Sequence, residues 1–379
     1  MNSTYRPNQV FVERGVTRSI ITRQVLQKLP GVPVHLIDSV GQLRARVKTL
    51  TPTIAVGKRT LVLARHRGSF FKYCPGSQTR GGKANVCCNY FVVNFASNCH
   101  MECSYCYLQS YLNFPYMIIY ANVEDLFAEV EEALSSSPNS YFRIGTGELA
   151  DSLALDPLTN YAQRLVEFFS GFGNAVLELK TKTDCVGGLL DLRHRGRTVV
   201  AWSINTPFVQ QQEEHKTVSI EDRLVAAQRC VAAGYRVGFH FDPLIHYPDW
   251  ENDYYGLVTE VFDRLPAESI AWFSIGALRM APQLRDKMRS RFPNSFLPLG
   301  ELVPCDDGKL RYVKRIRTRM YLRMLEWLRQ RSSSSTGIYA CMERPEVWSR
   351  VFGSSPLTDV EIGDRVTSGL RSESLRPES

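Results

Sequence analysis

Apolar residues recur along this chain with spacings that differ between its first quarter and its middle. From Ser19 to Leu29 they follow a helical spacing that ends at Pro30, and Val32–Ile37 has the composition of a short strand. Glycine, lysine and arginine dominate residues 72–83, which predicts a loop. Together these features predict a small N-terminal α/β subdomain over residues 1–88.

From residue 90 onward, short apolar runs alternate with longer amphipathic segments. The runs that predict strands are Tyr90–Asn94, Tyr141–Ile144, Ala175–Leu179, Thr198–Ile204, Arg236–Phe241 and Ile270–Ile275. Between them, Val123–Leu134 and Ile220–Ala233 are predicted helices, and Gly234 is a C-cap signal for the second. Strands separated by helices predict a parallel α/β sheet over residues 89–280, either open or closed into a partial barrel. The chemistry of such folds lies at the C-terminal strand ends.

Residues 281–353 form a third region, in which Val313–Arg331 is predicted to be a basic helix and Gly337–Cys341 a last strand. The helix also carries an apolar face. It therefore has two interpretations, a surface that contacts nucleic-acid phosphates or an ordinary amphipathic helix with a basic outer face. Residues 354–379 are polar and low in aromatics, which predicts a disordered tail.

Composition narrows the class of protein. The 379 residues are 44% hydrophobic and 22% charged, as in globular proteins. Neither a signal pattern nor a membrane-spanning apolar run is found, so we expect a cytoplasmic protein without a membrane partner. The net charge of +8 is consistent with a polyanionic partner. The ten cysteines are clustered, which favours a metal site in a reducing compartment over a disulfide framework.

Cys99, Cys103 and Cys106 have the spacing C-x3-C-x2-C, just beyond the first strand of the repeated series. Thiolates are the usual ligands of iron–sulfur clusters. Three ligands leave one iron of a four-iron cluster open, where a substrate or cosubstrate can bind. The alternative is a structural zinc site, which usually needs a fourth protein ligand, and His100 is poorly placed to supply it.

This motif, its position after a strand and the predicted fold resemble the radical S-adenosylmethionine superfamily. The resemblance implies a partial (β/α)6 barrel and a 4Fe–4S cluster held by the three cysteines. It also implies that S-adenosylmethionine binds the open iron and is cleaved to a 5′-deoxyadenosyl radical. A reducing electron donor, such as flavodoxin or ferredoxin, is then a further expected partner.

A narrower resemblance is to the spore photoproduct lyases. It rests on Cys103–Gln109, Trp202–Asn205, Ala232–Phe239 and Pro243–Ile245, which follow in the same order through about residues 90–260. The resemblance implies a lyase that repairs spore-type thymine lesions in DNA: the radical takes a hydrogen atom from the lesion, the methylene bridge breaks, and two thymines are restored. DNA is thus a candidate partner. The sequence does not indicate an oligomeric state.

The resemblance also assigns cosubstrate contacts. Gly147 and Glu148 resemble the Gly-Gly-Glu element, in which a carboxylate receives the methionine ammonium; the alternative is a simple strand-to-helix turn. Lys182, Ser203 and Asn205 follow or end the next two strands, and Lys182 and Ser203 are candidate contacts to the methionine carboxylate or the ribose. The alternative for Lys182 is a solvated surface lysine.

Tyr105 and Tyr107 flank Cys106 and are candidate catalytic residues, since tyrosines of this run in the lyases are linked to cosubstrate stacking and radical transfer. The alternative is that both are core aromatics beside the cluster. The residues His240, Asp242 and His246 end the fifth strand, where pocket polarity or ordinary hydrogen bonding is a better interpretation than a second metal site.

One part of the lyase pattern is missing. The lyases have a cysteine after the second barrel strand that returns a hydrogen atom to the thymine radical, and residues 142–152 contain none. Cys74, Cys87, Cys88 and Cys341 are candidate replacements, and the first three could equally be accessory metal ligands, a redox pair or small buried hydrophobes. Two other hypotheses stay open: a radical enzyme acting on a different nucleotide, peptide or small molecule, and a non-catalytic metal protein that binds nucleic acid.

Overall fold

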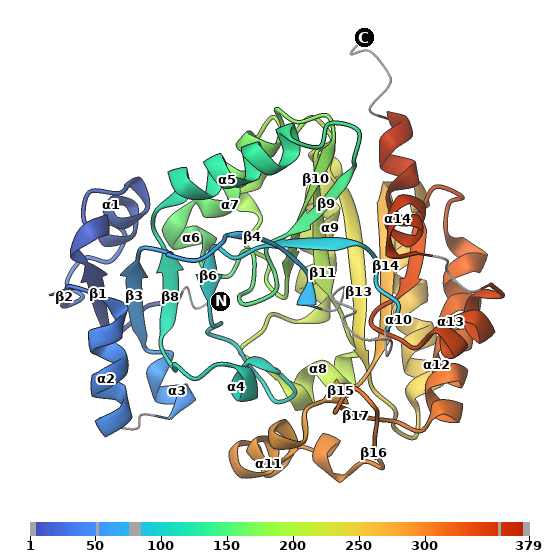
Figure 1. The fold of residues 1–379 in the computed structure, drawn as a ribbon. Helices are drawn as coiled ribbons and strands as arrows, with labels where there is room; N and C mark the ends of the chain where they lie inside the picture. Colours follow the sequence, from blue (N-terminus) through green and yellow to red (C-terminus); the bar gives the residue numbers. More distant parts are fainter. Residues whose placement is uncertain (1–4, 51–52, 76–84, 355–357, 374–379) are drawn as a thin grey trace.

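Two largely parallel sheets organise the chain. The computed structural model describes residues 5–50, 53–75, 85–354 and 358–373 (Figure 1). The first sheet has the order β2-β1-β3-β8-β6, formed by β1 (Gln9–Glu13), β2 (Val34–Ile37), β3 (Thr60–Ala64), β6 (Ala96–Ser97) and β8 (Met117–Tyr120). Only β6 runs antiparallel to its neighbour. The helices of this part are η1 (Arg14–Val16), α1 (Ile20–Gln27), α2 (Val40–Leu50) and α3 (Ile54–Gly57).

The second sheet has eight strands in the order β18-β14-β13-β11-β10-β9-β5-β4 and curls into a partial barrel. Its strands are β4 (Phe71–Tyr73), β5 (Tyr90–Val93), β9 (Phe142–Gly145), β10 (Ala175–Thr181), β11 (Thr198–Ser203), β13 (Arg236–Leu244), β14 (Ile270–Ala277) and β18 (Gly337–Ala340). Every pair is parallel except β4–β5. The six predicted strands and the predicted last strand are all confirmed, as is the partial barrel.

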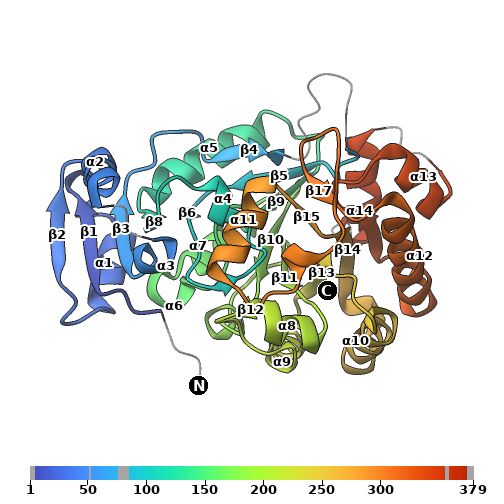
Figure 2. The ribbon, with the colours of Figure 1, turned by 90° about the horizontal axis from the view of Figure 1, so that it is seen from below.

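Helices cover the outer side of the barrel, and shorter elements lie at its ends (Figures 1 and 2). The helices are α4 (Leu108–Tyr111), α5 (Val123–Ser135), α6 (Asp156–Thr159), α7 (Tyr161–Phe169), η3 (Gly187–Leu189), α8 (Pro207–Glu213), α9 (Ile220–Ala232), α10 (Trp250–Arg264), η4 (Ala267–Ser269), α11 (Pro282–Arg291), η5 (Leu297–Leu299), α12 (Lys314–Arg331), α13 (Pro345–Phe352) and α14 (Asp359–Glu373). There are also two small antiparallel sheets. One pairs β7 (Glu102–Cys103) with β12 (Glu214–His215), and in the other β17 (Leu310–Arg311) lies between β15 (Arg279–Met280) and β16 (Val303–Pro304). None of the described helices is both long and apolar enough to cross a membrane.

The sheets do not follow the predicted regions. β4, from residues 1–88, pairs in the barrel sheet, whereas β6 and β8, from residues 89–280, extend the first sheet. β18, from residues 281–353, pairs with β14. The predicted regions divide the chain in sequence order, whereas strands pair with whichever strand edge lies beside them in the fold. The three predicted regions therefore contribute to two shared sheets. Of the predicted loop at 72–83, residues 72 and 73 end β4, and residues 76–83 lie outside the described part.

The disordered tail predicted from residue 354 is wrong where the structure describes it, because residues 359–373 form α14. Ile362, Val366 and Leu370 are spaced by four residues and are at most 5% exposed, so they form one buried helical face. A methyl group added to Gly337 of β18 would lie 2.7 Å from the Val366 carbonyl oxygen, so this glycine lets the helix approach the sheet closely. The low average hydrophobicity concealed this spacing.

Polar and aromatic side chains contact one another across the inside of the barrel. We call this set the buried polar layer; its members are Tyr90, Arg143, Glu178, His240, Trp272 and Tyr339. Glu178 accepts hydrogen bonds from Arg143 (3.1 Å) and Trp272 (2.8 Å) and bonds to His240 (2.6 Å). Glycines make room for the large rings: a methyl group on Gly145 would lie 1.5 Å from the Tyr90 hydroxyl. The barrel is therefore filled below its carboxyl edge, and chemistry is confined to that edge.

Candidate active site

The three motif cysteines lie on one loop beyond the carboxyl end of β5. Cys103 is buried together with Met101 and Ala154, and Cys99 and Cys106 pack against this group. Asn98, with a φ of 77°, turns the chain into the loop, and its side-chain oxygen accepts the Cys99 N–H at 2.9 Å. The sequence-predicted metal ligands are thus brought together.

Glu102, between the first two cysteines, ties this loop to distant parts of the chain. Arg291 of α11 contacts one carboxylate oxygen at 2.5 Å, and Lys58 lies 3.4 Å from the other. Lys58 Nζ also donates to the Met101 carbonyl at 2.5 Å. Lys58 and Glu102 are less than 10% exposed, so these contacts are shielded from water. The loop is therefore held from the end of α3 on one side and from α11 on the other.

The donor set fits an iron–sulfur cluster. Burial raises the pKa of all three thiols, that of Cys99 to about 12, so each sulfur is a thiol until a metal displaces its proton. In the described part of the chain, no three His, Cys, Asp or Glu side chains converge on the position of a single metal ion. The cysteines of a four-iron cluster bind different irons and need not converge, and soft sulfur ligands suit such a cluster.

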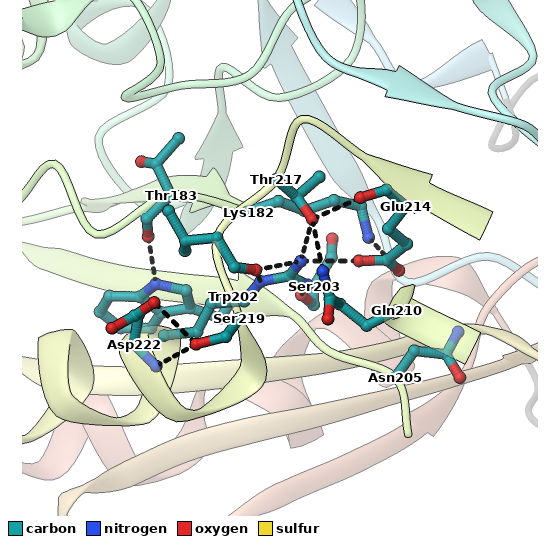
Figure 3. Close-up of polar contacts among 12 residues, drawn as sticks. Lys182, Thr183, Trp202, Ser203, Asn205, Gln210, Glu214, Thr217, Ser219 and Asp222 are labelled. Atoms are coloured by element: carbon teal, nitrogen blue, oxygen red, sulfur yellow. Dashed lines mark hydrogen bonds and ion pairs between the residues drawn. The ribbon is translucent and has the colours of Figure 1, made fainter. Parts of the chain in front are cut away.

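A buried carboxylate, Glu214, connects two of the predicted cosubstrate residues (Figure 3). Its Oε1 accepts from Lys182 Nζ at 2.9 Å and from the Tyr105 hydroxyl. Arg223 lies 2.7 Å from the other oxygen and donates to the Ser203 carbonyl at 2.8 Å. Burial alone would raise the pKa of Glu214, but Lys182 and Arg223 outweigh it and hold the pKa at about 2. Glu214 is opposite Cys103 in the β7–β12 pair, so the group borders the cysteine loop.

Asn205 does not join this group, and Figure 3 shows it apart from the contacts around Glu214. Its Oδ1 accepts from the Tyr254 hydroxyl (2.5 Å) and its Nδ2 donates to the Pro243 carbonyl (2.8 Å). The amide thus holds the end of β13 in place. Ser203 reaches the group through its backbone carbonyl, at the end of β11.

Gly147 and Glu148 lie in the turn that follows β9. The Glu148 carboxyl is partly buried, and burial raises its pKa. A methyl group on Gly147 would lie 3.1 Å from the Lys180 side chain, so the glycine lets that lysine pass close to the turn. Asp151 anchors the turn to the end of β10, because its carboxylate accepts from the Thr181 hydroxyl (2.7 Å) and the Lys182 N–H (2.8 Å).

The two tyrosines of the motif have different surroundings. Tyr105 directs its hydroxyl to Glu214, and the Lys182 ammonium lies 5.6 Å from the centre of its ring. Tyr107 is 45% exposed, donates to the Glu148 carbonyl at 2.6 Å and makes an edge contact with Tyr111. Only Tyr107 therefore presents much of its ring beyond the protein interior.

The remaining cysteines of interest fall into two places. Cys88 accepts from Arg143 of the buried polar layer at 3.6 Å. Cys341 follows β18 and accepts from Arg279 at 3.6 Å, while Cys74 and Cys87 lie near enough to affect its pKa, which burial raises to about 12. Three of the four thiols thus lie in one region around Cys341. Arg279, which contacts Cys341, pairs with Asp242 at 3.0 Å.

The outer charges of the basic helix α12 are largely paired with acidic side chains. Arg319 and Arg323 both pair with Glu251, and Arg331 pairs with Asp263 at 3.0 Å. Such pairing reduces the attraction of this face for phosphates, which favours the amphipathic-helix interpretation.

Sequence reasoning did not single out Glu214, Glu102, Lys58 or Asp151. Their partners lie far away along the chain, as with Lys58 and Met101, so no local spacing marks them. The one local signal was that two acids, Glu213 and Glu214, are adjacent. The structure places them at the end of α8 and the start of β12 and buries both, and buried carboxylates require partners.

Comparisons with known proteins agree in pointing to one family. A family model described as spore photoproduct lyase matches residues 5–316. The spore photoproduct lyase of Bacillus subtilis (strain 168) is 30% identical over 214 residues, and that of Geobacillus sp. (strain Y412MC61) is 29% identical over 214 residues. Each of these matches covers 56% of this chain and 63% of the relative, so it spans less than two thirds of the relative's length.

The spore photoproduct lyase of Clostridium acetobutylicum is 27% identical over 246 residues, which are 65% of this chain and 70% of that protein. A solved structure of a variant spore photoproduct lyase, with bound AdoMet and dinucleoside spore photoproduct, has a TM-score of 0.77 and 24% identity. The match covers 89% of this chain and 99% of that chain. Because only 24% of the residues are identical, the match establishes a shared fold and no more.

Proposed function

Since this chain belongs to the spore photoproduct lyase family, we propose that it is a radical S-adenosylmethionine enzyme that reverses thymine lesions in DNA. The observation that carries the proposal is the gathering of Cys99, Cys103 and Cys106 on one loop at the carboxyl edge of a partial barrel. The matched family region, residues 5–316, includes that whole loop. The reductant is proposed to be a flavodoxin or ferredoxin.

Cys99, Cys103 and Cys106 would hold the cluster through three irons. When bound, the cluster and S-adenosylmethionine supply a 5′-deoxyadenosyl radical. The chain's own contribution is to keep the loop rigid and shielded. Lys58 and Arg291 do so through Glu102, since each contact draws the loop toward a different part of the fold.

Glu148, Lys182 and Ser203 are proposed to bind the methionine end of the cosubstrate, with Gly147 giving the backbone room to approach. An ammonium group has three N–H donors. Those of Lys182 meet Glu214 at 2.9 Å and the Tyr105 hydroxyl at 3.2 Å, which leaves one for a cosubstrate carboxylate. Tyr105 therefore acts as a positioning residue for Lys182. Tyr107, with its exposed ring, is the proposed contact to the cosubstrate and its radical, and Asn205 is proposed to act only by holding the end of β13.

The first experiment tests the cluster. Anaerobically reconstituted protein is expected to bind four irons per chain and to form 5′-deoxyadenosine from S-adenosylmethionine when reduced with dithionite. Replacing Cys99, Cys103 or Cys106 by alanine should abolish both iron binding and cleavage. Cys230→Ala is the matched control, because this buried cysteine of α9 lies outside the motif. Wild-type iron content in a motif variant would overturn the ligand assignment.

The second experiment tests the substrate. The reconstituted enzyme is incubated with a synthetic spore photoproduct dinucleotide, and thymine dinucleotide is the expected product. Formation of 5′-deoxyadenosine without recovered thymine dinucleotide would reject lesion reversal while keeping the radical chemistry.

A second candidate function rests on one specific observation. Residues 142–152 contain no cysteine to return the hydrogen atom to the product radical. This favours a radical enzyme with another substrate, unless Cys74, Cys87 or Cys341 donates instead. In deuterated water a thiol donor would place deuterium in the recovered thymine, and loss of that label in one cysteine variant would identify the donor.

A further inference from the structure

A second set of charged side chains lies one step beyond the buried polar layer, toward the carboxyl edge of the barrel. Side chains two residues apart on a strand point to the same side. Glu178 and His240 belong to the buried layer, so Lys180 on β10 and Asp242 on β13 point inward above it. Lys180 accordingly affects the pKa of both His240 and Asp242.

Glycines let the charged side chains of this upper layer pass close to the neighbouring chain segments. Gly147, which follows β9, passes beside the Lys180 side chain. A methyl group on Gly276 of β14 would lie 2.6 Å from an Asp242 carboxylate oxygen. Lys180 and Asp242 thus occupy room that side chains at Gly147 and Gly276 would take, so charged groups line this layer where rings line the layer below.

Positive charge exceeds negative charge here. Arg279 holds Asp242 with two hydrogen bonds of 3.1 and 3.0 Å, so this pair neutralises itself. Lys309 directly precedes β17, whose Leu310 and Arg311 pair with Met280 and Arg279 of β15, so it lies beside Arg279. Burial, and then that guanidinium, lowers the pKa of Lys309. Within the described residues, no carboxylate lies within 4.0 Å of the ammonium of Lys180 or Lys309. Glu148 and Asp307 act on these lysines only at longer range.

We propose that Lys180 and Lys309 form an anion subsite that binds a phosphodiester of the substrate strand at the mouth of the barrel. Neither lysine has a role in the cluster or cosubstrate contacts described above. A phosphodiester offers acceptor oxygens to both ammonium groups, and its charge offsets the local excess. The inference rests on the proposed function in one respect, that the substrate is a nucleic-acid strand.

The test compares two single-stranded hexathymidylates of the same sequence, one with phosphodiester and one with neutral methylphosphonate linkages. The wild-type protein should bind the phosphodiester strand more tightly. Lys180→Met and Lys309→Met should each weaken that binding about tenfold and lower the slope of log affinity against log salt by about 0.7. Neither variant should change binding of the methylphosphonate strand. Lys314→Met is the matched control, because Lys314 is exposed on α12 and pairs with Glu346.

Several results would overturn the subsite. The first is equal affinity of the wild-type protein for both strands. The second is a loss of affinity in Lys314→Met as large as that in Lys180→Met. The third is that inorganic phosphate displaces the phosphodiester strand when its concentration only equals that of the strand's phosphodiester groups. Unchanged circular dichroism and iron content in each variant show that the fold is intact. The lesion assay is separate: if the phosphate preference persists without lesion reversal, the proposed function fails and the subsite stands.

Discussion

Glu178→Gln is expected to destabilise the protein strongly, although the substitution hardly changes the side chain's volume. Glu178 is fully buried, and Arg143, 2% exposed, is its ion-pair partner at 3.1 Å. Burial alone would raise the pKa of Glu178, but Arg143 and then His240 hold it well below its usual range. The carboxylate is therefore charged at every pH at which the protein is assayed, and glutamine removes that charge.

The size of the effect follows from what Arg143 loses. Removing one partner of a buried ion pair costs about 3–5 kcal/mol, because the other charge stays buried without compensation. Arg143 keeps its bond to the Tyr339 hydroxyl (2.7 Å) and its contact with the Trp272 ring (4.2 Å), which places the loss toward the lower value. With an unfolding entropy of about 2.1 cal/mol/K per residue, the 379 residues give about 0.8 kcal/mol/K. Tm should therefore fall by about 4–6 °C.

Thermal unfolding followed by circular dichroism at neutral pH measures this shift. Asp263→Asn is the control, because it removes an exposed pair with Arg331 and should move Tm by less than about 1 °C. The double variant Arg143→Met with Glu178→Gln should recover part of the loss, since no buried charge is then left alone. A Tm of Glu178→Gln within about 1 °C of the wild type would refute the reasoning that this pair is a mutually dependent buried charge.

Three further expectations concern other parts of the fold. Lys58→Met should speed the release of iron to a chelator from the reconstituted protein, because the cysteine loop loses its bond to this lysine. Lys216→Met, which removes a 63% exposed lysine, should not. Equal release rates in the two variants would contradict the role of Lys58 in holding the loop. Burial raises the pKa of Asp156 from 3.8 to about 6, so the native state retains a proton there that the unfolded state has released. This group should then contribute a loss of up to about 3 kcal/mol as pH rises from about 4 to about 6. Urea titrations measure that contribution as the change with pH in the stability difference between the wild type and Asp156→Asn, and a difference that is constant over this range would contradict it. Gly337→Ala should lower Tm by several degrees, because its methyl group meets the Val366 backbone of α14; an unchanged Tm would show that this helix is not packed against β18.

The barrel strands could be predicted from the sequence because strands of a covered parallel sheet are buried on both faces. Such strands are continuous apolar runs, and all six of the predicted series are present. The cysteine motif could be found because its meaning lies in local spacing. Both signals are contained within about ten residues of chain.

The pairing of distant edges could not be predicted in this way. β8 has the composition of a barrel strand, yet it pairs with β3 in the first sheet. α14 was hidden because three buried residues in a polar segment leave its average composition unchanged. Glu214 was missed for the same kind of reason, since its partner Lys182 lies 32 residues away and only the fold brings them together.

Strand alternation connects these observations, because it separates two uses of charge within one barrel. Glu178 and Lys180 are inward neighbours on β10, and His240 and Asp242 are inward neighbours on β13. In the lower layer, every charge has a partner at hydrogen-bond distance and rings fill the remaining space. In the upper layer, Lys180 and Asp242 pass beside Gly147 and Gly276, and Lys180 has no ion-pair partner among the described side chains. An unpaired charge is tolerated only where water or a ligand can reach it. The step of two residues from Glu178 to Lys180 therefore leads from the structural core to a surface on which a charged substrate can bind.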